Sequence, residues 1–272
     1  MSTILDIADV ELAFGGVHAL DRTSFSVDEG QIVGLIGPNG AGKTTLFDCI
    51  SGFQRPDAGR IVYTHADGSS VELGSRPAHD RIVLGIGRLF QQAKLFPSVT
   101  VRDVIRTAQH RSLHAGFFRS VLGIGTAPAE EREAARRADE ALEVVGLSAH
   151  GDKPAMELST GMLRLCEIAA IVSVRPRLLL LDEPSSGIAQ KETEALLPLL
   201  RRLRDTLDAT VLVIEHDMPL VMGVADRIVA MASGRVIAQG TPARVQAHPD
   251  VLQSYLGTRA VASTNGHGRR RR

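Results

Sequence analysis

The chain has 272 residues, of which 44% are hydrophobic, and it carries 31 basic and 31 acidic side chains. This length suits one α/β domain with an embedded subdomain, and the hydrophobic fraction is ample for a buried core. The formal net charge of zero excludes a sequence-wide basic field that would attract nucleic acid, so we predict no nucleic-acid partner.

The cysteines and the hydropathy pattern bear on the compartment. Cys49 and Cys166 are too few and too isolated to form a disulfide framework, which favours a reducing, cytosolic setting. The first residues, MSTILDIADVELAF, lack the basic and apolar regions of a signal peptide. No stretch approaches the roughly 18 apolar residues that span a bilayer, so any membrane-spanning partner is expected to be a separate chain.

The apolar pattern predicts strands first, then a mostly helical middle from about residue 95 to 175, and then alternating strands and helices. Strands are predicted for residues 4–14, 31–37, 177–184 and 209–217, and hairpins for 60–73 and 227–240. Helices are predicted for 44–53, 99–110, 128–147, 159–174, 192–207 and 219–225. This order indicates a parallel-sheet core interrupted by a helical insertion.

The stretch GPNGAGKTT matches the phosphate-loop pattern G-x-x-x-x-G-K-[ST], and it stands between a predicted strand and a predicted helix. Glycines let successive backbone N–H groups point at phosphate oxygens, and the helix N-terminus adds partial positive charge. Lys43 is expected to reach the β- and γ-phosphates, and the Thr44 hydroxyl to bind Mg²⁺. The alternative, a chance glycine-rich turn, does not require this context. The residues expected to hold ATP are Gly37, Pro38, Asn39, Gly40, Ala41, Gly42, Lys43, Thr44 and Thr45.

The stretch LLLLDEP provides the acidic partner of such a loop. Its four leucines indicate a buried strand, and Asp182 at the carboxyl end is placed to hold the Mg²⁺ ion. Glu183 follows directly, where a carboxylate can polarise an attacking water. The alternative is a strand that merely ends in an acidic turn.

These motifs occur in a definite order, together with Gln91 in RLFQQAKLF, LSTGM at 158–162, SSGIAQKE at 185–192 and His216 in VIEHD. In that order they resemble an ABC-type ATPase over residues 3–257, and more closely the ATP-binding subunits of branched-chain amino acid importers. The resemblance implies an α/β P-loop NTPase fold (RecA-like) with a parallel-sheet core, an antiparallel β subdomain and a helical insertion. It places the core with the β subdomain at 3–90 and 176–257, and the helical subdomain at 91–175. Residues 258–272 are expected to form a disordered basic tail, with contact to anionic headgroups or RNA as the alternative.

The resemblance also implies roles for three scattered residues. Phe14 in LAFGG would stack on adenine, although its pattern alone favours strand core. Gln91 would sense the γ-phosphate and bind Mg²⁺, although an isolated loop glutamine is usually just solvated. His216 would contact the γ-phosphate and position the water, although a histidine at a strand end is otherwise solvated or capping.

The LSTGM stretch begins a predicted helix, and Ser159 is a good N-cap by residue type. The resemblance implies that Ser159 and Gly161 face the γ-phosphate held by a second subunit. The pattern departs from the family at Met162, where glutamine is usual, and at Ala189, where aspartate or asparagine is usual. We therefore expect a heterodimer with unequal sites, in which this chain hydrolyses its own nucleotide and completes a weakened site for its partner.

The expected function is an ATP-hydrolysing subunit of an importer at the cytoplasmic face of the inner membrane, with ATP and Mg²⁺ as cofactors. Its expected partners are a second ABC ATPase subunit, two transmembrane permease subunits and, indirectly, an external solute-binding protein. The alternatives are an exporter of lipid or polysaccharide, a non-transport ABC ATPase of DNA repair or the ribosome, and a regulatory module that no longer hydrolyses ATP. Intact Glu183 and His216 disfavour the last alternative.

Overall fold

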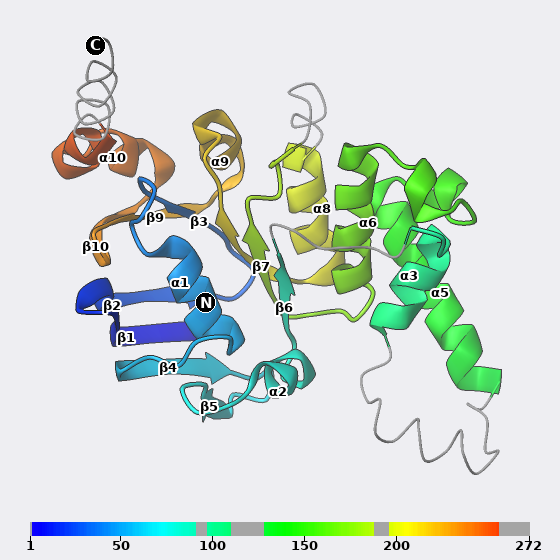
Figure 1. The fold of residues 1–272 in the computed structure, drawn as a ribbon, viewed down its shortest axis with the longest axis horizontal. Coiled ribbons are helices and arrows are strands. Elements are labelled where there is room, and N and C mark those ends of the chain that lie inside the picture. Colours follow the sequence, from blue (N-terminus) through cyan, green and yellow to red (C-terminus); the bar gives the residue numbers. More distant parts are fainter. Residues whose placement is uncertain (1, 91–96, 110–127, 188–195, 256–272) are drawn as a thin grey trace, which may run out of the picture. The chain divides into compact units, whose positions relative to one another are not determined.

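The computed structural model describes residues 2–90, 97–109, 128–187 and 196–255. The chain divides into two compact units, a first unit of residues 1–84 and 210–272, and a second unit of residues 85–209. Figure 1 shows the elements of both along the chain. The predicted domain boundaries at 90/91 and 175/176 differ from these limits and stay a prediction.

The first unit contains a four-stranded antiparallel sheet in the order β2-β1-β4-β5. The apolar pattern predicts β1 and the hairpin of β4 and β5 but no element at β2, whose polar residues obscure the alternation of a strand. Pairing along β1 creates this strand. The four strands are β1 (Thr3–Phe14), β2 (Val17–Asp28), β4 (Ala58–Thr64) and β5 (Ser70–Glu72).

Four further strands of the first unit lie in the order β10-β9-β3-β8. Strand β3 is parallel to both β8 and β9, and every residue of β3 and β8 is buried, as apolar runs predict for a parallel core. Strand β10 pairs with β9 as the predicted hairpin. The strands are β3 (Ile32–Ile36), β8 (Thr210–Ile214), β9 (Arg227–Ala232) and β10 (Arg235–Gly240), and the helices of this unit are α1 (Lys43–Ser51), α2 (Ala78–Val83), α9 (Met218–Val224) and α10 (Pro242–Gln246).

A buried arginine fixes the carboxyl end of α1. Arg81 in α2 is 2% exposed, and its guanidinium donates to the carbonyl oxygens of Cys49, of Ile50 at 2.5 Å and of Leu73 at 2.7 Å. A cation is favourable there because the carboxyl end of a helix carries partial negative charge. Burial lowers the pKa of Arg81 to about 10, so the side chain is still a cation at neutral pH.

The second unit combines a parallel strand pair with helices. The strands are β6 (Ile86–Leu89) and β7 (Leu178–Asp182). Thr100 caps α3, because its side chain accepts from the Asp103 N–H. One face of α5 is apolar and buried, with Ala138, Ala141 and Leu142 on it. The helices are α3 (Val101–Ala108), α5 (Pro128–Val145), α6 (Thr160–Val172) and α8 (Leu196–Leu207), with short 3₁₀ helices at Ser148–His150 and Ala155–Glu157.

The two cysteines are structural. Cys49 and Cys166 are both free, as predicted, and both are buried. Burial raises the pKa of each thiol to about 12, so neither is a thiolate at neutral pH.

Within the described ranges, no helix has the length and apolar character needed to cross a membrane.

Candidate functional site

The phosphate loop of the first unit comprises residues 37–45, from the end of β3 into the first turn of α1. Gly42 is the N-cap of α1, with φ of 98° and no side-chain hydrogen bond at the cap. The first N–H groups of the helix therefore point into the loop without a capping side chain, which favours an anion. The predicted succession of buried strand, loop and helix is confirmed.

Two glycines of this loop leave no room for a side chain. A Cβ atom on Gly37 would lie 2.1 Å from the carbonyl oxygen of Met231, and one on Gly42 would lie 2.3 Å from that of Ala19. Both glycines also have positive φ, 150° and 98°, which other residues rarely adopt. A bare backbone is what a phosphate cradle needs, because its N–H groups can then contact oxygens directly. The loop therefore has a backbone shape that suits the phosphates of a nucleoside triphosphate.

The side chain of the loop lysine folds back onto the backbone at the start of the phosphate loop. Lys43 is 6% exposed, and its Nζ donates to the carbonyl oxygens of Gly37 at 2.7 Å and Pro38 at 3.1 Å. The side chain of Thr44, the next residue, is exposed. A cation and an accessible hydroxyl at adjacent positions suit a phosphate and its metal ion. Their roles in ATP binding stay predictions.

A tyrosine near the C-terminus contacts the entry of the phosphate loop. Tyr255 packs against a buried cluster that includes Ile36, the last residue of β3, and Val251. Burial raises the pKa of Tyr255 and the nearby backbone of Gly37 acts in the opposite direction, so the phenol remains protonated at neutral pH. The C-terminal segment thus packs beside one end of the loop.

We expect Tyr255→Phe to lower affinity for ADP about twofold to tenfold, because the phenol hydroxyl lies beside the Gly37 backbone and one polar contact contributes about 0.5–1.5 kcal/mol. Titration of the purified chain with a fluorescent ADP analogue measures the effect. The control is Tyr63→Phe in β4, a change at the other tyrosine of the chain. Equal affinity of Tyr255→Phe and wild type would contradict a supporting role.

Phe14 and His216 are both exposed in the first unit. Phe14, at the end of β1, is 49% exposed, so its interpretation as strand core is wrong, because the ring lies beyond the packed face. His216 follows β8, and the side-chain cap of α9 is Asp217, whose carboxylate accepts from the Leu220 N–H at 2.9 Å. Asp217, and not His216, therefore caps α9, while the exposure of His216 agrees with the solvated half of that alternative. Contacts of Phe14 with adenine and of His216 with the γ-phosphate stay predictions.

The acidic end of β7 in the second unit is tightly held. Asp182 is 1% exposed, and its carboxylate pairs with Arg88 of β6 at 3.4 Å. Glu183 is half-buried and has a φ of 47°. A left-handed conformation costs a non-glycine residue about 1–2 kcal/mol. Strain of this kind is typical of functional sites.

The available ligands suit magnesium bound with a nucleotide. In the first unit, the exposed Thr44 hydroxyl beside the phosphate loop is an oxygen donor of the kind that Mg²⁺ prefers. In the described part of the chain, no group of three or more His, Cys, Asp or Glu could hold a metal by itself. Mg²⁺ is usually bound by one or two protein oxygens together with phosphates, and a hydroxyl next to the phosphate loop fits that pattern. That Asp182 of the second unit binds the ion stays a prediction. Gln91, the other predicted ligand, lies outside the described residues.

The start of α6 has the predicted cap. The Ser159 Oγ accepts from the Met162 N–H at 3.2 Å, while the side chains of Ser159 and Thr160 are exposed and Gly161 is buried. The thioether of Met162 donates no hydrogen bond, unlike the glutamine usual at this position. That this helix end faces a partner's nucleotide stays a prediction, and Ala189 lies outside the described residues.

Two buried arginines of the second unit escaped the sequence analysis. Arg88 contacts the predicted metal ligand Asp182, and Arg164 in α6 is 5% exposed. The available signal is an arginine inside an apolar run, GIGRLF or MLRLCEIAA, since a buried charge is usually paired. That signal indicates burial but does not name the partners.

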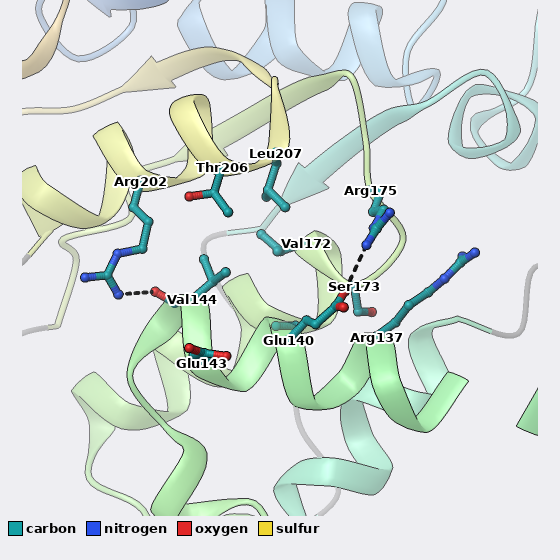
Figure 2. Close-up of a pocket in the computed structure, with 11 residues that line it drawn as sticks. Arg137, Glu140, Glu143, Val144, Val172, Ser173, Arg175, Arg202, Thr206 and Leu207 are labelled. Carbon is teal, nitrogen blue, oxygen red and sulfur yellow. Dashed lines mark hydrogen bonds and ion pairs between the residues drawn. The ribbon is translucent and has the colours of Figure 1, made fainter. Parts of the chain in front are cut away.

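A cavity of about 660 Å³ lies in the second unit among α5, α6 and α8 (Figure 2). On its wall, Glu140 pairs with Arg175 at 2.9 Å, and Arg202 donates to the carbonyl oxygen of Val144 at 3.1 Å. Dashed lines in Figure 2 mark both contacts. None of the residues selected from the sequence lines this cavity.

Comparison with known sequences shows which protein family the chain matches. The family model described as ABC transporter matches residues 20–186, and a model for a branched-chain amino acid ATP-binding cassette transporter matches residues 235–261. The high-affinity branched-chain amino acid transport ATP-binding protein BraF of Pseudomonas aeruginosa is 40% identical over 93% of this chain and 98% of its own length. The corresponding protein LivG of Escherichia coli K12 is 38% identical over the same shares.

Solved structures with a similar fold are also ATP-binding cassettes of ABC transporters. The ADP conformation of an ATP-binding cassette of an ABC transporter has a TM-score of 0.79 and 29% identity, covering 94% of this chain and 100% of that chain. A nucleotide-free ATP-binding cassette has a TM-score of 0.78 and 28% identity, covering 93% and 98%. The predicted P-loop NTPase fold is thereby confirmed. The chain belongs to the ABC transporter family, as one of its ATP-binding cassettes.

Proposed function

We propose that the chain is the ATP-hydrolysing subunit of an importer of branched-chain or related amino acids. The observation that carries this proposal is the 40% identity over 93% of the chain to a protein named for branched-chain amino acid transport. The match of residues 235–261 to a model for the same class of transporter supports it, because this segment lies outside the general cassette match.

Residues of the phosphate loop bind the nucleotide in this proposal. The N–H groups at the start of α1 donate hydrogen bonds to the phosphate oxygens, and the cationic Nζ of Lys43 neutralises the β- and γ-phosphates. Exposed Phe14 covers the adenine ring. Thr44, Asp182 and Gln91 would be the ligands of Mg²⁺, and the bound ion would neutralise charge on the phosphate oxygens.

Hydrolysis then depends on a correctly placed carboxylate. Glu183 orients the attacking water and takes up its proton, and His216 holds the water against the γ-phosphate. Ser159 and Gly161, in the first turn of α6, contact the nucleotide of a partner subunit. Since Met162 lacks the glutamine donor, this partner site is the weaker one, which suits a heterodimer.

The partners are a second ABC ATPase subunit, two transmembrane permease subunits and an external solute-binding protein that acts indirectly. The chain then works at the cytoplasmic face of the inner membrane. Because the permease and the binding protein contact the solute, they select it, and this chain supplies the free energy of ATP hydrolysis.

Reconstitution tests this function. The tagged chain is purified with the membrane subunits that accompany it, placed in liposomes containing ATP, and assayed for uptake of labelled leucine, isoleucine and valine. We expect uptake that needs ATP and the solute-binding protein. Purification without any membrane chain, or ATP-driven movement of lipid or polysaccharide in place of amino acids, would exclude the proposal.

A further inference from the structure

The buried guanidinium of Arg164 binds several carbonyl oxygens of the backbone at the end of β7. The Nη2 of Arg164 donates to the carbonyl oxygens of Asp182 at 2.8 Å and Glu183 at 3.1 Å, and its Nε donates to that of Pro184 at 3.4 Å. Three consecutive carbonyl groups therefore converge on one side chain of α6. These groups belong to the turn in which Glu183 adopts its positive φ.

The same side chain also holds the segment that leads to Gln91. The Nη1 of Arg164 donates to the carbonyl oxygen of Phe90 at 2.6 Å and to Glu167 at 2.8 Å. The guanidinium carbon of Arg88 lies 4.8 Å from the centroid of the Phe90 ring. Arg164 thus connects the end of β6, the end of β7 and the body of α6, all within the second unit.

Only an arginine can make this set of contacts. Its guanidinium presents five N–H donors in a rigid plane, whereas lysine presents three donors on one compact ammonium group. Carbonyl oxygens spread over residues 90 and 182–184 cannot all be reached from one ammonium. The side-chain pair with Glu167, which is 10% exposed, balances the buried charge.

We propose that Arg164 is a positioning residue for ATP hydrolysis, which sets the backbone of Asp182 and Glu183 and ties it to the helix that begins after Ser159. The inference rests on the proposed ATPase function. A displacement of about 1 Å at a reacting group can cost about 100-fold in rate, so a looser turn at Glu183 lowers turnover. The residues of the phosphate loop remain unchanged, so nucleotide affinity is preserved.

The test variant is Arg164→Lys in the reconstituted complex. We expect kcat to fall about tenfold, which corresponds to about 1.4 kcal/mol, with the KM for ATP and the affinity for a fluorescent ADP analogue within about twofold of wild type. The matched control is Glu167→Gln, which disturbs the same ion pair but keeps the carbonyl contacts of Arg164. We expect its kcat within about twofold of wild type.

Amide hydrogen exchange of the full chain without nucleotide gives an independent readout. In Arg164→Lys, exchange in residues 182–187 is expected to be about tenfold faster, while β3 and α1 exchange as in wild type. The proposal is overturned if kcat is unchanged, if Glu167→Gln lowers kcat equally, or if exchange rises throughout the second unit. Should Arg164→Lys fail to fold, the double variant Arg164→Met, Glu167→Met removes the ion pair as a unit and carries the same expectations.

The two hypotheses fail in different ways. A wild-type complex that does not hydrolyse ATP would contradict the proposed function. The exchange result does not depend on nucleotide, so it reports whether Arg164 orders residues 182–187 in either case.

Discussion

Lys43→Ala is expected to lower affinity for ATP about 100-fold or more and to remove measurable hydrolysis. The reason is that a hydrogen bond to a charged group contributes about 1.5–3 kcal/mol, and the lysine is expected to contact two phosphates. The variant also loses the bonds from Nζ to the carbonyl oxygens of Gly37 and Pro38. Titration with a fluorescent ATP analogue and phosphate release by the reconstituted complex measure both effects.

The control for this substitution is Lys153→Ala, because Lys153 is an exposed lysine of the second unit. It should bind and hydrolyse ATP as the wild type does. Thermal unfolding of both variants shows whether the loop change spreads to the fold. If Lys43→Ala binds and hydrolyses nucleotide normally, the assignment of residues 37–45 to the phosphates fails, and the proposed function fails with it.

Glu183→Gln is expected to lower kcat of the reconstituted complex about 100-fold or more while ATP binding stays within about twofold. Loss of a general base costs about 10²–10⁴-fold in rate, and an amide cannot take up the proton of the water. Glutamine is close in shape to glutamate, so the turn with positive φ at this position is kept. Phosphate release under saturating ATP measures kcat, and equilibrium titration measures binding.

The matched control is Glu72→Gln, at an exposed position of β5. The size of the loss in Glu183→Gln also tests the unequal sites inferred from Met162. If this chain hydrolyses its own nucleotide and the partner's site is the weak one, nearly all turnover disappears. Retention of most turnover would show that the partner's carboxylate does the work, contrary to our hypothesis.

Three supports found in the structure bear on these experiments. Arg164 holds the carbonyl groups of Asp182 and Glu183, Arg88 pairs with the Asp182 carboxylate, and the Tyr255 hydroxyl lies beside the backbone of Gly37. None of the three is expected to contact the nucleotide itself. Their variants should therefore change rate or affinity in part, whereas Lys43→Ala and Glu183→Gln remove a contact to the reacting groups.

The sequence by itself determined the local features of this protein. The phosphate loop could be located because its glycines, Lys43 and Thr44 are contiguous and stand between an apolar run and a helical pattern. The Ser159 and Thr100 caps could be predicted for the same reason, since a cap bonds to an N–H three residues away. Both partners of such a short-range interaction lie within a few consecutive residues, so the local sequence is enough to predict it.

The tertiary structure alone decided which distant groups meet. Arg164 binds carbonyl groups 18 to 74 positions away along the chain, and β2 exists through its pairing with β1 despite an unpromising pattern. Phe14 is exposed although its pattern favours core, because an alternating pattern does not tell where the packed face of a strand ends. Contacts between residues far apart in the chain depend on how whole helices and strands pack. The local hydrophobic pattern of a segment does not specify that packing.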